Sequence, residues 1–292
     1  MFILPTDSDR RRPPETGPSG HVATVPAVLT GDRSVRRFDA ADHASIARFM
    51  AEDATGSALI CGDAEAVLSE LPAGVFQSCV TSPPYWSLRD YGVPGQIGLE
   101  ESVSGYIDRL VKVFSQVRRV LKDDGTLWLN VGDSYTSGGR TSRAPDKKNP
   151  ARAMNVRPPT PEGLKPKDLI GVPWLLTFAL QKDGWYLRAD IVWNKLNCQP
   201  ESVKDRPTRS HEYVFLFSKS ERYRYDAAAA RGPNGRNIRT AWDIPTRPHP
   251  QAHFATFPPA LVEPCIKPAP GRTTLSWIRS SGRIPLASSR SN

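Results

Sequence analysis

Strand-like and helix-like segments alternate through the middle of this chain, and this alternation most limits the folds that it can adopt. Short apolar runs at residues 58–61 and 75–80 enclose a helical pattern at residues 64–71. Apolar residues then recur at helical spacing over residues 104–121, and a further strand-like run follows at residues 126–135. Repeated units of strand and helix predict an α/β protein with a mainly parallel, doubly wound sheet.

The same pattern continues towards the C-terminus and sets the expected boundaries. Gly125 is expected to end the helix before it, and Asp168 to cap a third helix that runs through Leu180. Two more strand-like runs and a short helical segment follow. The sequence therefore predicts one sheet domain over residues 56–266.

Two segments of the chain have little periodicity. Residues 1–55 are rich in Pro, Gly, Asp and Arg, so we expect a mostly disordered leader there. Residues 136–167 lie inside the predicted domain and contain several Gly and Pro, with eight basic side chains against two acidic ones. A loop of this length inside an α/β domain is usually functional or disordered.

The charge of the chain favours a polyanionic partner such as nucleic acid. Lys and Arg number 39 against 30 Asp and Glu, a formal net charge of +9. Two basic segments are candidates for phosphate contacts, the long loop and the RPTRS stretch with Arg206 and Arg209; a solvated basic loop is the alternative for the first. The candidates in the long loop are Arg140, Arg143, Lys147, Lys148, Arg152, Arg157, Lys165 and Lys167.

Cysteine and apolar content exclude other classes of protein. The four cysteines are scattered and none has a spacing that suits zinc, so no metal site is predicted. No apolar run approaches the roughly 18–20 residues of a membrane span, and the N-terminus has no signal-peptide core. We therefore expect a cytoplasmic protein that does not contact a membrane.

The stretch TSPPYW, residues 81–86, follows directly on the apolar run 75–80. Pro83 and Pro84 fix φ and carry no backbone donor, so they end the strand in a stiff loop at its carboxyl end. Ligands of open α/β sheets bind at that edge. Ser82 offers a hydroxyl, Tyr85 an aromatic face, and the Ser and Pro carbonyls are expected to point outward.

This combination of groups suits a flat ring that carries an amino group. A nucleobase flipped out of a duplex stacks on an aromatic side chain while oxygen atoms accept the hydrogens of its exocyclic amine. The amine lone pair is normally delocalised into the ring, which makes it a poor nucleophile. Acceptors that draw both N–H bonds out of the ring plane would localise the lone pair on nitrogen.

From about residue 59 to residue 266 the chain resembles the amino-methylating DNA methyltransferases of the permuted β group, in which the catalytic loop precedes the cofactor loop. The resemblance is an ordered series rather than a single motif. The matching segments are ICGDAEAVL, TSPPYWSLRDYG, GTLWLNVGDSY, KPKDLIGVPW, RADIVWNKLN, DRPTRSHEYVFLFSK and FATFPPALVEPCI. The resemblance implies a Rossmann-like, circularly permuted fold that binds S-adenosylmethionine and double-stranded DNA. It also implies a partner protein, a cognate restriction endonuclease that acts on the same DNA site.

The resemblance also implies roles for individual residues. Ser82, Pro83, Pro84 and Tyr85 correspond to the motif that holds the target base, and a leading Ser is typical of cytosine-N4 methylation, with adenine N6 as the alternative. The implied cofactor-binding residues are Gly62, Asp63, Ala64, Thr81, Phe257 and Pro258. By spacing alone Asp63 is also a candidate helix cap, and the FPP sequence a turn.

The resemblance stops at about Lys267. The family there carries a strand leading into a glycine-bearing loop of the form D-P-F-x-G-S, whereas this chain continues KPAPGRTTLSWIRSSGRIPLASSRSN, without an Asp. In a reading frame shifted by one base, the last base of each codon joins the first two of the next, and the junction of Trp277 and Ile278 then encodes Asp. The neighbouring codons are compatible with the sequence LDPFFGSNTTG in that frame. We expect residues 267–292 to be a disordered tail after a one-base frameshift, leaving the fold C-terminally incomplete.

Three hypotheses therefore differ in function. The first is an enzyme that methylates cytosine N4 in duplex DNA, impaired in this chain by the missing cofactor loop. The second is a DNA-binding remnant without catalysis, which the missing loop favours. The third, an RNA-binding module, is weaker because no segment resembles the paired aromatics of RNA-recognition motifs. The sequence leaves the recognition site and the oligomeric state open.

Overall fold

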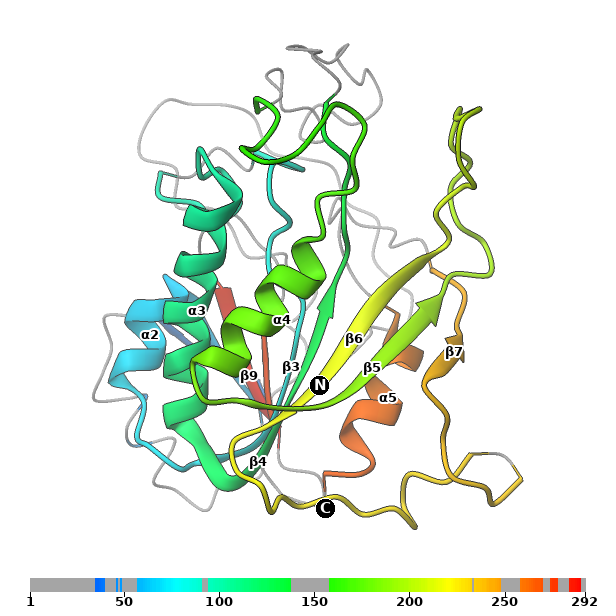
Figure 1. Cartoon of the computed structure of the whole chain (residues 1–292). Helices are drawn as coiled ribbons and strands as arrows, with labels where there is room; N and C mark the ends of the chain where they lie inside the picture. The colour runs from blue at the N-terminus through cyan, green and yellow to red at the C-terminus, as the bar shows by residue number, and fades with distance from the viewer. Residues whose placement is uncertain are drawn as a thin grey trace, which may run out of the picture.

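The computed structural model describes residues 35–39, 46, 48, 57–90, 94–137, 158–232, 234–247, 258–269, 274–277 and 284–289. These residues form one sheet with helices on both faces (Figure 1). The elements are β1 (Val35–Asp39), β2 (Ser57–Gly62), α2 (Ala64–Glu70), β3 (Phe76–Thr81), α3 (Val103–Val120), β4 (Leu121–Val131), α4 (Val172–Lys182), β5 (Tyr186–Asn194), β6 (His211–Ser218), β7 (Ala241–Asp243), α5 (Pro259–Ile266), β8 (Thr274–Trp277) and β9 (Ile284–Ser289).

The strands lie in the order β1-β2-β9-β8-β3-β4-β6-β5-β7. This sheet is mixed, which corrects the expectation of a mainly parallel one: β6 runs antiparallel to both β4 and β5, and β9 antiparallel to both β2 and β8. For β5 and β6 the reason is the connection, because residues 195–210 join the two strands without a crossover helix and a strand that returns directly must run antiparallel.

Side chains alternate between the two faces of the sheet and build two apolar cores. Leu127 and Leu129 of β4 face the larger core, which α2, α3 and α4 cover. Trp128, between them, faces the second core beneath α5. Helices on both faces are what a doubly wound sheet requires. Among the described residues, no helix has the length and apolar character needed to cross a membrane.

The predicted helices are present, but two of the expected boundaries are wrong. Helix α3 ends at Val120, and Gly125 lies inside β4 instead of ending the helix. Helix α4 begins after Gly171, whose φ of 82° lies in the left-handed region, and not after Asp168. The Asp168 carboxylate instead accepts a hydrogen bond from the backbone N–H of Lys165 at 2.8 Å.

A carboxylate from another element caps α4. Asp133, just past the end of β4, accepts hydrogen bonds from the backbone N–H groups of Gly171 at 3.0 Å and Val172 at 3.1 Å. Its side chain is only 2% exposed. These contacts satisfy donors that the first turn of a helix leaves unpaired, and they fix α4 to the carboxyl edge of the sheet.

Two strands of the C-terminal segment stand inside the sheet. Strand β8 pairs in parallel with β3, with Trp277 opposite Thr81, and β9 pairs with both β8 and β2. This differs from the expectation that residues 267–292 lie outside the core as a disordered tail. The physical reason is that β2 and β3 would otherwise each have an edge of unpaired backbone groups, which any extended segment can satisfy.

Part of the expected leader is also ordered. Strand β1 pairs in parallel with β2, with Val35 opposite Ser57 and Asp39 opposite Cys61, and Ile46 is buried against the larger core. Most of residues 1–55 lie outside the described residues, so the expectation of a disordered leader stays a prediction for them.

The cap on α4 gives a test of this arrangement. Replacing Asp133 with Ala should lower the free energy of unfolding by about 2 kcal/mol, because the backbone donors at the start of α4 lose their acceptor. Asp133→Asn keeps an acceptor oxygen and should lose less. Urea unfolding measures both, and equal stability of Asp133→Ala and the parent chain would contradict the cap.

Candidate functional site

The proline loop leaves the sheet at the carboxyl end of β3, as expected, and helix α3 holds its backbone. Thr81 and Ser82 are buried. The hydroxyl of Tyr106, a fully buried side chain of α3, donates a hydrogen bond to the carbonyl of Pro84 at 2.6 Å. The Pro84 carbonyl therefore has a partner in the core, outside any strand ladder. Because the two prolines carry no backbone donor, this bond to a carbonyl helps to tie the loop to the core.

The segment at residues 98–100 also supports the loop. The backbone N–H of Ser87 donates to the carbonyl of Gly98 at 2.7 Å, and the indole of Trp86 donates to the carbonyl of Glu100 at 2.9 Å. A Cβ on Gly98 would lie 3.0 Å from the Tyr85 carbonyl oxygen, and the φ of 100° at Gly98 is itself disfavoured for other residues. The loop can approach this segment so closely because residue 98 is glycine.

The Tyr85 side chain is anchored by a half-buried acidic residue, Glu212, which was not among the predicted site residues. The Tyr85 hydroxyl donates to Oε2 of Glu212, at the start of β6, at 2.7 Å. The Nδ2 of Asn130, in β4, donates to the same oxygen at 3.1 Å. The Nζ of Lys195 lies 2.5 Å from the other carboxylate oxygen, Oε1. Three side chains from separate parts of the chain thus contact one carboxylate.

Glu212 carries its negative charge at neutral pH. Burial alone would raise the pKa of the carboxyl group, but the charge of Lys195 and the hydrogen bonds from Lys195, Tyr85 and Asn130 outweigh it and lower the pKa below its ordinary value of 4.5. A carboxyl group with a lowered pKa loses its stabilising contribution only as the pH falls through that folded-state value. The anchor of Tyr85 is therefore intact throughout the neutral range.

Glycine at position 132 makes room for this arrangement. A Cβ there would lie 2.8 Å from Cε2 of the Tyr85 ring and 3.3 Å from the carboxylate carbon of Glu212. The ring of Tyr85 therefore packs directly on the backbone just beyond β4.

The predicted cofactor residues lie at two separate places. At the end of β2, Asp63 is the N-cap of α2 and its side chain accepts from the backbone N–H of Ala66 at 3.1 Å, so the helix-cap alternative is confirmed. Gly62 and Ala64 on either side of it are buried. Any contact between Asp63 and a cofactor stays a prediction.

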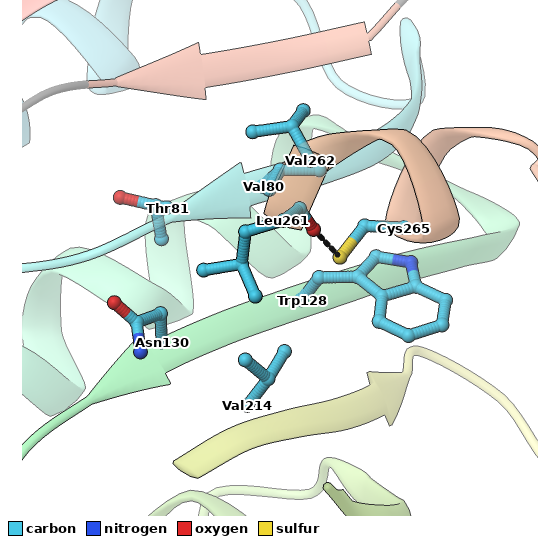
Figure 2. Close-up of a pocket in the computed structure, with 8 residues that line it drawn as sticks. All are labelled: Val80, Thr81, Trp128, Asn130, Val214, Leu261, Val262 and Cys265. Atoms are coloured by element: carbon cyan, nitrogen blue, oxygen red, sulfur yellow. Dashed lines mark hydrogen bonds between the residues drawn. The ribbon is translucent and has the colours of Figure 1, made fainter. Parts of the chain in front are cut away.

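The other place lies between β3, β4 and α5, around Thr81 (Figure 2). Thr81 and Asn130 lie there at the strand ends, and Leu261 and Val262 of α5 close the apolar side. Pro258 is the N-cap of α5, while Phe257 lies outside the described residues. The cavity between these side chains measures about 10 Å³, which is room for about one water molecule.

These two places are not adjacent. Strands β9 and β8 separate β2 from β3, and three inter-strand steps span roughly 14 Å. Asp63 and the proline loop therefore cannot touch one another, and only a ligand of nucleoside size or larger could contact both.

The predicted DNA contacts differ in how far the structure describes them. Arg206 stacks on Tyr135, with its guanidinium carbon 3.9 Å from the ring centroid, and pairs with Glu201 at 2.7 Å. Arg209 lies 3.9 Å from the Asp133 carboxylate and is mostly buried. Lys165 and Lys167 are exposed. The remaining candidates lie outside the described residues, namely Arg140, Arg143, Lys147, Lys148, Arg152 and Arg157.

The described residues contain no group of His, Cys, Asp and Glu side chains arranged to hold a metal ion. The residues that sequence reasoning missed are those behind the loop: Tyr106, Asn130, Gly132 and Glu212. One signal was available for Glu212, since a lone acidic residue at the start of the apolar stretch HEYVFLFSK must find partners if it is buried.

Comparisons with known proteins agree with this architecture. Residues 76–269 match the family model described as DNA methylase, for N6 and N4 methyltransferases. The chain is 60% identical over 237 residues to the Type II methyltransferase M.XycI of Xanthomonas campestris pv. cyanopsidis, covering 79% of each chain. The chain belongs to the N6/N4 DNA methylase family.

Further relatives extend this picture. The Type II methyltransferase M.SmaI of Serratia marcescens is 61% identical over 214 residues, which cover 71% of this chain and 73% of that one. The solved structure of the PvuII DNA methyltransferase (cytosine-N4-specific) has a TM-score of 0.56 at 18% identity and covers 74% of this chain and 72% of that one. The second likeness shows that the two chains share a fold.

The residues of this N6/N4 methylase fit the expected cofactor, S-adenosylmethionine, only in part. The cavity at Thr81 is far smaller than the ~300 Å³ or more of a pocket for a drug-sized ligand. The segment after β8, IRSSGR at residues 278–283, contains no carboxylate that could accept the hydroxyls of a ribose. The described residues therefore do not form a complete cofactor site.

The close approach at Gly132 predicts a measurable cost. Gly132→Ala should lower the free energy of unfolding by about 1–3 kcal/mol, because the added methyl group must displace the Tyr85 ring or the Glu212 carboxylate. Gly232→Ala is the matched control, since its Cβ would meet nothing closer than 3.7 Å. Chemical denaturation of both variants gives the comparison, and equal costs would refute the tight packing.

Proposed function

We propose that this chain comes from a lineage of site-specific DNA methyltransferases that methylate the exocyclic N4 amine of cytosine in duplex DNA. The carrying observation is the proline loop, which the buried Tyr106 and the half-buried Glu212 hold at the carboxyl edge of a methyltransferase sheet. Its leading residue is Ser82, which is typical of cytosine-N4 methylation.

The loop is suited to receiving an amine-bearing base. Tyr85 supplies an aromatic face whose hydroxyl is fixed, so that a flipped cytosine stacks on a ring of defined orientation. The oxygen acceptors for the two amine hydrogens are the Ser82 hydroxyl and the second lone pair of the Pro84 carbonyl, whose first lone pair accepts from Tyr106. With both hydrogens drawn out of the ring plane, the nitrogen lone pair is available for a methyl group. Adenine N6 is the second candidate, because adenine presents a similar amine.

Analysis of the methylated product distinguishes the two bases. A protein with a complete cofactor site should transfer radiolabelled methyl groups from S-adenosylmethionine to DNA, and hydrolysis of that DNA to nucleosides should yield N4-methyldeoxycytidine. N6-methyldeoxyadenosine as the labelled product would establish the adenine alternative. The matched control is the same protein with Tyr85→Ala, which should lose roughly 1–3 kcal/mol of base stacking.

The position of β8 supports the proposal that the order of elements is circularly permuted and that the reading frame is shifted. Strand β8 follows every other strand except β9 in sequence yet lies beside β3, at the level of Thr81. The shifted frame would place Asp at the junction of residues 277 and 278, just where β8 ends, and a glycine-bearing turn after it. In doubly wound sheets that turn receives the cofactor.

The frame proposal predicts a difference in activity between two proteins. The 292-residue chain should methylate DNA slowly or not at all, whereas a protein read in the shifted frame after about Lys267 should bind S-adenosylmethionine and methylate cytosine. Resequencing the gene and assaying both proteins with labelled cofactor tests this. Robust methylation by the 292-residue chain would show that the missing turn is dispensable, and a dead shifted-frame protein would favour the DNA-binding remnant.

The same proposal assigns the partners. We infer that the basic loop contacts the phosphates of double-stranded DNA through Arg140, Arg143, Lys147, Lys148, Arg152 and Arg157. For Arg206 and Arg209 the support is weaker, because internal ion pairs already engage both. A cognate restriction endonuclease acting on the same site is the protein partner that a Type II methyltransferase implies.

A further inference from the structure

We propose that Glu212 is a positioning residue, which fixes the ring of Tyr85 in the orientation on which a flipped base stacks. The inference rests on the proposed function for the meaning of that orientation, but the anchoring itself is a property of this chain. Glu212 lies 127 residues from Tyr85 in sequence and belongs to a different strand.

The carboxylate accepts the hydrogen bond of the Tyr85 hydroxyl, at the tip of the ring. Its Oε2 accepts from the Tyr85 hydroxyl at 2.7 Å and from Asn130 at 3.1 Å, and its Oε1 is paired with Lys195. Asn130 donates in addition to the backbone carbonyl of Tyr213, which fixes its own amide. A swing of the Tyr85 ring about its Cα–Cβ bond would break the bond to Glu212 and remove one donor from a carboxylate whose side chain is only 16% exposed.

The network acts by orientation rather than by net charge. Lys195 neutralises Glu212 at 2.5 Å, and its ammonium group also lies 4.9 Å from the centroid of the Trp193 ring, so the cation is held in place. A neutral, fully hydrogen-bonded cluster has little long-range field to act on a substrate. What remains is the directional bond to the phenol, which is stronger than a bond between neutral groups because its acceptor is ionised.

The root of the loop has its own, separate anchor. Tyr106 donates to the Pro84 carbonyl at 2.6 Å, one residue before Tyr85. Removing Glu212 should therefore free the ring of Tyr85 while the loop backbone stays in place. This separation allows a positioning role to be told from a general structural role.

Fluorine NMR of the full chain tests the anchor directly. With 3-fluorotyrosine at position 85, recorded at a pH where the phenol is protonated, the resonance should be broad and displaced from that of free fluorotyrosine. In Glu212→Ala it should narrow and move most of the way towards the free value, since the ring is released. In Glu212→Gln it should stay near its parent position, because the amide oxygen still accepts from the phenol.

Two controls separate ring release from unfolding. A second sample labelled at Tyr106 should give the same spectrum in every variant, because that hydroxyl reports the loop backbone. Lys195→Met should lower the midpoint of urea unfolding yet leave the Tyr85 resonance displaced. A Tyr85 resonance that does not move in Glu212→Ala overturns the proposal. The proposal is also overturned if the Tyr85 fluorine of the parent chain shows the solvent isotope shift of the free amino acid. This measurement does not depend on the folding of any variant.

Binding of DNA connects the anchor to the base. Duplexes in which a fluorescent cytosine analogue replaces cytosine should change their emission when the full chain binds. Tyr85→Phe and Glu212→Ala should weaken this change to the same extent, with no further loss in the double variant, because both remove one interaction. Additive losses would overturn the coupling. A chain that binds no DNA would refute the proposed function while leaving the fluorine result to decide the anchor.

Discussion

Two consecutive prolines give the loop after β3 its stiffness but deprive it of backbone donors, and the architecture around the loop follows from this constraint. A segment that cannot donate must be held through its carbonyl groups and side chains. Here a buried phenol on α3 reaches the Pro84 carbonyl, and a carboxylate on β6 receives the Tyr85 hydroxyl. Glycines at positions 98 and 132 allow the supporting backbone to approach closely. The surrounding structure thus holds the stiff loop in position.

The parts of the fold that depend on local pattern were predictable from the sequence. The helical spacing in α3 and the apolar run of β3 were sufficient to place both, and the prolines placed the loop at the functional edge. The family and its cofactor followed from an ordered series of segments, and the match to the DNA methylase model agrees with them.

What the sequence did not reveal depends on pairing between distant residues. The cap on α4 comes from Asp133, 38 residues before the N-cap residue Gly171, so the nearer Asp168 was the natural but wrong candidate. The support of Tyr85 by Glu212 is likewise invisible until β4 and β6 lie side by side. The positions of β8 and β9 depend on which sheet edges remain open, and periodicity carries no information about that.

Strands β8 and β9 fill the space between β2 and β3 through backbone hydrogen bonds. This space therefore requires extended backbone more than particular side chains. The sheet at this place can therefore stay closed when the side chains that a ligand needs are changed.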